Sequence, residues 1–248
     1  MSRTFVIGDI HGDLEQLDTL LGRLPALAAG DTLVFLGDYV DRGPCSRQVV
    51  ERVRALQTDS PAHVVTLRGN HEDAWLRVAD KGWPEFLLPE GNGCLACMRS
   101  YTGAPWQDGD APTPDELRTM MKAAFYPADV VDWFRALPHW FENEHAIYVH
   151  AGLPDDGAGG WQHPDQVVDR DILLWIRTKS FFTDYRGKPV VVGHTVTETL
   201  PAEYSSYTPD DPGDLWAGEG VIAIDTGCGK GGFLTAVELP ARVVYESR

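Results

Sequence analysis

Six side chains of the types that bind divalent metal ions follow short apolar runs of this chain. They are Asp9, His11, Asp38, Asn70, His150 and His194. Carboxylate, amide and imidazole ligands without a thiolate suit Mn²⁺, Fe or Zn²⁺. Each residue alone is explained equally well as part of a polar turn or as a buried histidine. Because five glycine-flanked polar segments would otherwise have to converge by accident, we favour one shared metal site.

The ligand types indicate how two ions would share these residues. Asp9 and His11 are separated by one residue, so both can reach the first ion. The second ion takes the remaining amide and imidazole donors, Asn70, His150 and His194. Asp38 is left to bridge, because a carboxylate has lone pairs for two cations. Such ions lie about 3.5–4 Å apart and generate a hydroxide nucleophile at neutral pH.

The segment from Gly37 to Gly43 carries two further charged residues, Asp41 and Arg42. It follows the apolar run Thr32–Leu36, which is typical of a buried strand in a parallel sheet. Open α/β sheets bind their ligands where such strands end. A surface turn with an ion pair between the two charged residues would explain the segment by itself, so its assignment to a site depends on the other segments.

The first three polar segments follow three predicted strands, at residues 4–7, 32–36 and 62–67. Between the first two strands we expect a helix whose apolar face consists of Leu14, Leu17, Leu21 and Leu24. A second helix is expected to begin at Pro44. This β-α-β-α-β order makes the strands parallel and places all three segments at the same edge of the sheet.

The rest of the chain is expected to complete one domain over residues 1–248. Further strands are predicted at residues 146–149, 189–192, 221–224, 233–239 and 242–245, with mainly antiparallel pairing. Further helices are predicted at residues 115–124, 128–137 and 165–176. Residues 79–114 contain repeated Gly and Pro, and we expect them to form a variable cover over the site, as a helical hairpin.

Composition and charge limit the classes of partner. The 248 residues carry a net charge of −16 without a run of Lys and Arg, so nucleic acid is not expected as a partner. The sequence contains neither a signal-peptide core nor a stretch that approaches a membrane span. We therefore expect a cytoplasmic protein that has no membrane partner.

Two of the four cysteines, Cys94 and Cys97, form a C-x-x-C pair. Since no second pair completes a zinc site, we interpret them as ordinary loop thiols. A redox switch is the alternative. It predicts a loss of activity on mild oxidation that Cys94→Ser would abolish.

Taken together, the polar segments resemble the signature blocks of the phosphoprotein phosphatases, which are metallophosphoesterases of calcineurin-like fold. The blocks are Gly8-Asp9-Ile10-His11-Gly12, Gly37-Asp38-x-x-Asp41-Arg42-Gly43, Gly69-Asn70-His71-Glu72, His150-Ala151-Gly152 and Gly193-His194-Thr195. Chain length and the segment Ile224-Asp225-Thr226-Gly227 resemble the compact bacterial and phage lambda branch. The resemblance implies an α/β fold in which a central β-sandwich is flanked by helices, in α/β/β/α layers.

The resemblance also implies roles for individual residues. The six ligands would hold two divalent ions, with Mn²⁺ expected first and Fe or Zn²⁺ as alternatives. His71 would donate a proton to the leaving oxygen, and Asp41 would orient its ring. Asn70, Arg42 and Arg177 would bind phosphate oxygens. The last of these lies in Leu174-Trp175-Ile176-Arg177, which resembles the segment of the second phosphate-binding arginine.

By this resemblance we expect a metal-dependent phosphomonoesterase, and specifically a serine/threonine or dual-specificity protein phosphatase. Its substrate would be a phosphorylated protein or a small phosphoester, and no regulatory subunit is implied. The alternative is a symmetrical diadenosine tetraphosphatase or another nucleotide phosphohydrolase. That sister family typically has Ala at the position of Asp41 and Asp at that of Glu72, so both residues favour the protein phosphatase.

Other classes fit less well. A metal-binding scaffold without catalysis would lack a ligand or the general acid, and none is missing. A cysteine phosphatase needs Cys-x₅-Arg, and neither Cys45 nor Cys94 has an arginine at that spacing. A phosphate-binding P-loop ending at Lys230 would need glycine at Ile224, so that glycine cluster is interpreted as a tight turn.

Overall fold

One mixed sheet carries the first three polar segments. The computed structural model describes residues 2–207 and 210–248. Strands β1 (Thr4–Ile7), β2 (Thr32–Phe35) and β3 (His63–Thr66) pair in parallel. Helices α1 (Leu14–Arg23) and α2 (Ser46–Asp59) connect them. The predicted β-α-β-α-β unit is confirmed, so the three segments that follow these strands share one edge.

Two C-terminal strands complete this sheet on its other side. Strand β9 (Thr235–Leu239) runs antiparallel to β1, and β10 (Val243–Glu246) runs antiparallel to β9. The order is β10-β9-β1-β2-β3, which places β1 in the centre. The last residue of β1, Ile7, therefore pairs with Phe35 on one side and with Ala236 on the other.

A second sheet carries the later histidine segments, in the order β4-β5-β6-β8-β7. Strands β5 (Ile147–Val149), β6 (Val190–Val192) and β8 (Val221–Ala223) are parallel. Edge strands β4 (Trp140–Glu142) and β7 (Trp216–Ala217) are antiparallel to their neighbours. The expected antiparallel pairing is confirmed for β9 and β10 of the first sheet. It is wrong for the inner strands of the second sheet, because long crossover segments between them allow parallel pairing.

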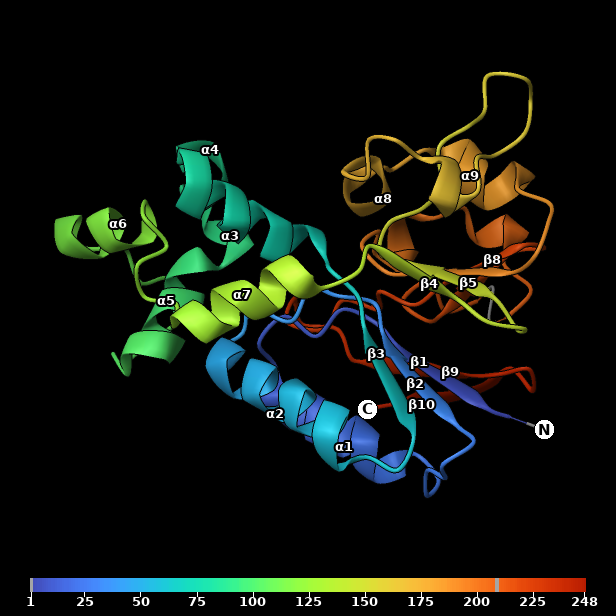
Figure 1. Cartoon of the computed structure of the whole chain (residues 1–248), viewed down its shortest axis with the longest axis horizontal. Coiled ribbons are helices and arrows are strands. Elements are labelled where there is room, and N and C mark those ends of the chain that lie inside the picture. Colours follow the sequence, from blue (N-terminus) through green and yellow to red (C-terminus); the bar gives the residue numbers. More distant parts are fainter. Residues whose placement is uncertain (1, 208–209) are drawn as a thin grey trace.

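The two sheets pack against each other, and helices cover their outer faces. Val34, Val191 and Val237 belong to one buried cluster to which both sheets contribute. Figure 1 shows α1 and α2 along the first sheet, with α8 (Ile172–Trp175) and α9 (Lys179–Asp184) beyond the second. The predicted central β-sandwich with flanking helices is confirmed.

Helices fill the connection between β3 and β4. They are α3 (Asn70–Lys81), α4 (Pro84–Leu87), the short 3₁₀ helix η1 (Glu90–Asn92), α5 (Cys94–Thr102), α6 (Pro114–Met120) and α7 (Ala128–Ala136). The segment from 79 to 114, which we call the cover segment, therefore begins inside α3. The predicted helices at 115–124 and 128–137 are confirmed as α6 and α7, with shorter bounds.

The C-x-x-C pair lies in α5, so the interpretation as loop thiols is wrong. Cys94 and Cys97 are buried and free, and the Cys97 sulfur lies 3.1 Å from the hydroxyl of Tyr126. Burial raises the pKa of both thiols well above the ordinary value, which favours the protonated form. Both cysteines therefore pack as core side chains of the helix. The redox switch stays a prediction.

The continuous helix predicted at residues 165–176 is also wrong. Only the 3₁₀ turn η2 (Pro164–Gln166) and the short α8 form there. The carbonyl of Leu173 accepts a hydrogen bond from Ala151 N at 2.9 Å, which ties the segment to the end of β5. Val168 is 98% exposed. This contact with the sheet, rather than an amphipathic helix, decides the conformation.

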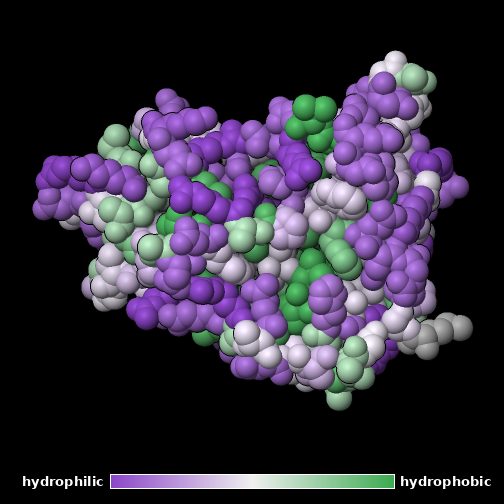
Figure 2. Space-filling view, in the orientation of Figure 1, coloured by the Kyte–Doolittle hydropathy of each residue, from purple (hydrophilic) through white to green (hydrophobic). Residues whose placement is uncertain are grey.

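Two more 3₁₀ helices, η3 (Thr197–Thr199) and η4 (Ala202–Tyr204), follow β6. Figure 2 shows that the face in this view is mostly hydrophilic and that its hydrophobic residues form separate small clusters. Within the described part of the chain, no helix is both long and apolar enough to cross a bilayer. The acidic segment after residue 207 is described only from residue 210 onward.

Candidate dimetal active site

Metal-binding side chains from both sheets meet at one buried place. His11, Asp38 and His71 form one group, and Asp38, His150 and His194 form another. Within each group the ligand atoms lie within 4.8 Å of one another, and all five side chains are buried. Asp38 belongs to both groups. The segments that follow β1, β2, β3, β5 and β6 thus converge, as their positions after strands predict.

Asp38, His150, His194 and Asn70 surround one of the two positions. Asn70 Oδ1 lies 2.9 Å from His150 Nε2 and 2.8 Å from His194 Nδ1. His150 Nδ1 lies 2.9 Å from the carbonyl of Leu36 and donates to it, which leaves the lone pair on Nε2. That lone pair faces Asp38 Oδ1 at 3.5 Å. A backbone hydrogen bond of this kind fixes the orientation of metal-binding histidines.

His11 and Asp9 stand at the other position. His11 Nδ1 donates to the carbonyl of Val40 at 3.1 Å, so its Nε2 also carries a lone pair. This atom lies 3.4 Å from Asp38 Oδ2 and 3.9 Å from Asp9 Oδ2. Asp9 in turn accepts the backbone N–H of His194 at 3.0 Å. The two histidine lone pairs therefore point at carboxylate oxygens, an arrangement that a cation between them would stabilise.

The electrostatics of the site fit divalent ions. Burial, with the charges of Asp225 and Asp38, raises the pKa of Asp9 well above the ordinary value. Burial and the guanidinium of Arg42 lower the pKa of His11 well below it. Neutral imidazoles and ionised carboxylates are the forms that ligate metal. Divalent cations would relieve the repulsion among the carboxylates.

The ring of His194 faces the other ligands of its group through Nδ1, which lies 2.8 Å from Asn70 Oδ1. Burial and the charges of His150 and Arg177 lower the pKa of His194 well below the ordinary value. Its Nε2 is buried, and no hydrogen-bond partner reaches it from residues 2–207 or 210–248. A buried polar atom without a partner costs about 1–3 kcal/mol, so such atoms normally have one. A water molecule would be such a partner, whereas Nδ1 is the ring atom that is left for a metal ion.

Backbone strain is concentrated at the site. Among the described residues, seven other than glycine have a positive φ, and five of these belong to the site. The five are His11, Asp38, Asp41, Arg42 and His194. Such conformations cost about 1–3 kcal/mol each and persist where the surroundings enforce them. The strained backbone aims these side chains inward.

Two glycines allow the close approach of the strand ends. A Cβ at Gly69 would lie 2.2 Å from Asp38 Oδ1, and a Cβ at Gly193 would lie 2.0 Å from Asp9 Oδ1. Both carboxylates would be displaced by any side chain there. The glycines of these blocks are thus required by the packing of the site.

Glu72 fixes the loop that carries Asp38. Its carboxylate accepts backbone hydrogen bonds from Asp38, Tyr39 and Gly69 at 2.8–2.9 Å. Burial and the charge of Asp38 raise the pKa of Glu72 to about 8, against the opposing effect of these bonds. From the sequence pattern, Glu72 was recognised only as a family marker. Its position three residues after Gly69, at the beginning of α3, is a capping-box signal for this structural role.

The predicted general-acid pair is in contact. His71 Nδ1 lies 2.6 Å from Asp41 Oδ2. Trp75 Nε1 donates to both Asp41 oxygens, at 2.9 and 3.0 Å, which the sequence did not predict. Arg42 contacts His11 Nε2 and lies 3.5 Å from His71 Nε2. The ring of His71 therefore faces the site through Nε2 and is held through Nδ1.

The two predicted phosphate-binding arginines are the more accessible members of the site. Arg42 is half-buried, whereas Arg177 is exposed directly after α8. The positive charge of Arg177 contributes to the lowered pKa of His194, so the two residues are near one another. Trp175, which precedes it by two residues, contacts the His194 ring edge-on at 6.4 Å between centroids. Arg177 thus lies at the rim of the site.

Asp225 and Lys230 also belong to the surroundings of the site. Asp225 is buried, and its charge raises the pKa of Asp9. Lys230 Nζ lies 3.2 Å from Asp225 Oδ2. The turn interpretation of this glycine cluster is confirmed, with positive φ at Gly227, Gly229 and Gly231. The pair was not predicted as part of a site, because nothing in the local sequence indicates its position.

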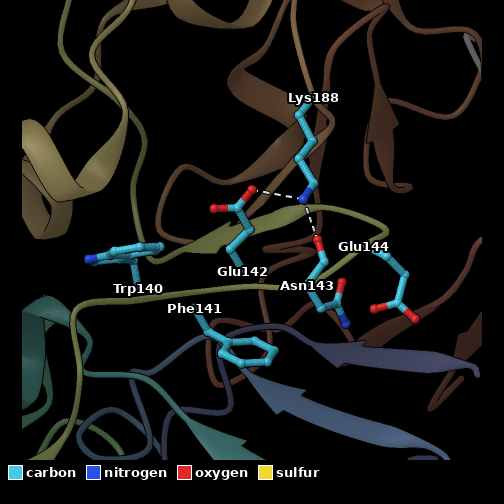
Figure 3. A pocket seen from close by; sticks show the side chains of 6 residues that line it. All are labelled: Trp140, Phe141, Glu142, Asn143, Glu144 and Lys188. Atoms are coloured by element: carbon cyan, nitrogen blue, oxygen red, sulfur yellow. Dashed lines mark hydrogen bonds and ion pairs between the residues drawn. The ribbon is translucent and has the colours of Figure 1, made fainter.

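A separate surface pocket lies at the edge strand β4. It has a volume of about 510 Å³ and is lined by Trp140, Phe141, Glu142, Asn143, Glu144 and Lys188. Figure 3 shows the ammonium of Lys188 pointing to Glu142, at 2.7 Å, and to the carbonyl of Asn143. None of these six residues belongs to the metal-binding groups. The pocket therefore plays no part in the site.

The fold and the two His/Asp groups define a metal-dependent phosphohydrolase, and comparison with known proteins agrees. The sequence model described as calcineurin-like phosphoesterase matches residues 2–215. This chain belongs to the calcineurin-like phosphoesterase family.

Its relatives include bis(5'-nucleosyl)-tetraphosphatases. The asymmetrical enzyme PrpE of Anoxybacillus flavithermus is 29% identical over 95% of this chain and 89% of its own length. A symmetrical enzyme of Dechloromonas aromatica is 26% identical over 98% of this chain and 95% of its own length. A crystal structure provisionally described as a diadenosine tetraphosphatase has a TM-score of 0.61 at 23% identity, covering 98% of this chain and 92% of its own. That structural likeness supports the fold.

Proposed function

We propose that this protein hydrolyses bis(5'-nucleosyl) tetraphosphates. The observation that carries this proposal is that relatives similar over nearly the whole chain are tetraphosphatases. The expected protein phosphatase activity becomes the second candidate. This reverses the ranking from the sequence, in which Asp41 and Glu72 favoured the phosphatase.

In this proposal the predicted ligands hold two divalent ions, with Mn²⁺ expected first. They are Asp9, His11, Asp38, Asn70, His150 and His194. When bound, such ions supply a hydroxide nucleophile at neutral pH and stabilise phosphoryl oxygens. The shared membership of Asp38 in both groups supports its assignment as the bridging ligand. The contact of Asn70 with His150 and His194 supports its assignment to the second ion.

Three side chains would bind the reacting phosphoryl group. Arg42 contacts His11 and lies near His71, whereas Arg177 lies at the rim near His194. Asn70 donates through its amide nitrogen while its oxygen faces the two histidines. Fixed donors of this kind stabilise the charge that develops on phosphoryl oxygens.

His71 would protonate the leaving oxygen from Nε2. Asp41 accepts the Nδ1 proton, which fixes the tautomer and the ring orientation. Trp75 holds the carboxylate from its other side, so Asp41 has little freedom to turn away.

A serine/threonine protein phosphatase is the second candidate, and the same pair favours it. The alkoxide of serine is a poor leaving group that needs a proton, whereas a nucleoside polyphosphate leaves as a stable anion. A general acid held in position therefore increases the rate of a phosphomonoesterase more than that of a phosphoanhydride hydrolase.

An activity panel separates the two candidates. The protein loaded with Mn²⁺ is assayed against diadenosine tetraphosphate, a phosphoserine peptide, a phosphotyrosine peptide and p-nitrophenyl phosphate. We expect kcat/KM for the dinucleotide to exceed that for either peptide by about tenfold or more, a difference of 1.4 kcal/mol in transition-state stabilisation. A higher kcat/KM for the phosphoserine peptide would replace the proposal by the second candidate.

A further inference from the structure

A large pocket opens beside the metal-binding groups. It has a volume of about 820 Å³ and lies between the cover segment with α6 on one side and the turn at residues 229–231 on the other. Arg42 lines this pocket and also contacts His11 and His71. The pocket and the site therefore share one side chain, and a molecule could occupy both.

Two cations, Arg42 and Lys230, line the pocket where it meets the site; the lining also contains Asp13, and Lys230 pairs with the buried Asp225. A Cβ added at Gly229 would lie 2.6 Å from the Cβ of His11. The glycine turn thus packs directly on a residue of the metal-binding group. A chain of phosphates that leaves the metal centre in this direction would pass both cations.

The rest of the pocket is largely apolar. Its wall includes Leu87, Leu95, Trp106, Leu117 and Met120. Carboxylates of Glu90 and Asp108 are exposed in the same wall. Apolar and aromatic walls with a few polar groups are typical of small-molecule sites. An indole can stack on a nucleobase, and carboxylates accept hydrogen bonds from exocyclic amino groups.

The loop that carries Trp106 is fixed by one arginine. Arg99 donates to the carbonyl of Pro105 at 3.0 Å and to Glu116 at 2.8 Å, and it also pairs with Asp110. Asp110 closes the loop by accepting the N–H of Gln107 at 2.9 Å. The backbone on both sides of Trp106 is thus held in place. A loop that is ordered before binding loses little conformational entropy when a ligand binds.

We propose that this pocket binds one nucleoside of a dinucleoside polyphosphate, with the base stacked on Trp106 and the intervening phosphates on Arg42 and Lys230. This inference rests on the proposed function and specifies where its substrate is recognised. The cover segment then selects nucleotides, while the residues at the strand ends do the chemistry. A phosphorylated protein would not require an aromatic pocket beside the metal-binding groups.

Trp106→Ala tests the proposal, with Trp106→Phe as the conservative variant. We expect Trp106→Ala to raise KM for diadenosine tetraphosphate about tenfold relative to KM for p-nitrophenyl phosphate, in line with the loss of one stacked base. Trp106→Phe should restore most of the affinity. Tyr204→Ala, an exposed aromatic residue of η4, is the matched control and should change neither constant.

A binding measurement keeps this test separate from that of the proposed function. Adenosine monophosphate is titrated into each variant by calorimetry without added metal, and Trp106→Ala should weaken its binding about tenfold. Equal dissociation constants for the Trp106→Ala and unsubstituted proteins would overturn the pocket assignment even if the dinucleotide is cleaved. Binding that depends on Trp106 without cleavage of the dinucleotide would support the pocket and refute the tetraphosphatase activity.

Discussion

His71 Nδ1 lies 2.6 Å from Asp41 Oδ2, and Trp75 donates to both oxygens of the same carboxylate. The three residues come from the loop after β2 and the first turns of α3. Their contact holds the His71 ring in one orientation. As the proposed general acid, His71 matters more the poorer the leaving group is.

His71→Asn should therefore affect substrates unequally. We expect turnover of a phosphoserine peptide to fall by roughly 10²–10⁴-fold, the usual effect of a lost general acid. Cleavage of diadenosine tetraphosphate should fall less, because its leaving group is a stable anion. Steady-state kinetics on both substrates give the comparison, and mass spectrometry gives the metal content. Loss of bound metal would make His71 a ligand, as its grouping with His11 and Asp38 also allows.

Asp38→Asn should abolish binding of two metal ions together with activity. The residue belongs to both metal-binding groups, and an amide supplies neither the charge nor the second ligand atom. Metal analysis after dialysis measures the stoichiometry, with Asp18→Asn on the exposed side of α1 as the control. Two ions per chain in the Asp38 variant would refute the bridging assignment.

Arg42→Ala should weaken competitive inhibition by inorganic phosphate. Hydrogen bonds to charged groups contribute about 1.5–3 kcal/mol, so we expect the inhibition constant to rise at least tenfold. Arg52→Ala is the matched control, since Arg52 forms an exposed ion pair with Asp18 on the helical side of the first sheet. An unchanged constant for Arg42→Ala would mean that phosphate is held elsewhere.

Glu72→Gln should lower the free energy of unfolding by about 1–3 kcal/mol. One carboxylate oxygen becomes an NH₂ group that faces backbone N–H donors, so buried donors lose their acceptor. Urea denaturation measures the change, and the exposed Glu51→Gln is the control. Equal stability of the two variants would show that the loop after β2 does not need this carboxylate.

Glu116 should make stability depend on acid pH. The hydrogen bond from Arg99 and those within the capping box lower the pKa of Glu116 to about 2, from an ordinary value of 4.5. A carboxyl whose folded pKa is depressed stabilises the protein above its unfolded pKa, and this contribution is lost as pH falls toward 2. Glu116→Gln should therefore cost about 1 kcal/mol at pH 6, after allowance for solvent screening, and almost nothing at pH 2. Thermal melts at both values measure this; an equal cost would contradict the ion-pair explanation.

The sequence predicts the convergence of the strand-end residues better than it predicts the helices and turns that surround them. Asp9, Asp38 and Asn70 lie two to four residues after strands, so parallel pairing brings them to one edge. Trp75 and Lys230 could not be assigned this way, because their roles depend on how a helix and a distant turn pack. The helix predicted at 165–176 failed for the same reason, since a bond from Ala151 to Leu173 overrides the local pattern.

The central position of β1 affects the order in which this protein can form during synthesis. Asp9 lies two residues after the end of β1. This strand lies between β2 and β9, and β9 begins only at Thr235. Until the ribosome has made β9, one side of β1 has no partner and its backbone N–H and C=O groups stay open. The nascent chain can assemble the early parallel unit, but the metal-binding groups are fully supported only after β9 has been added.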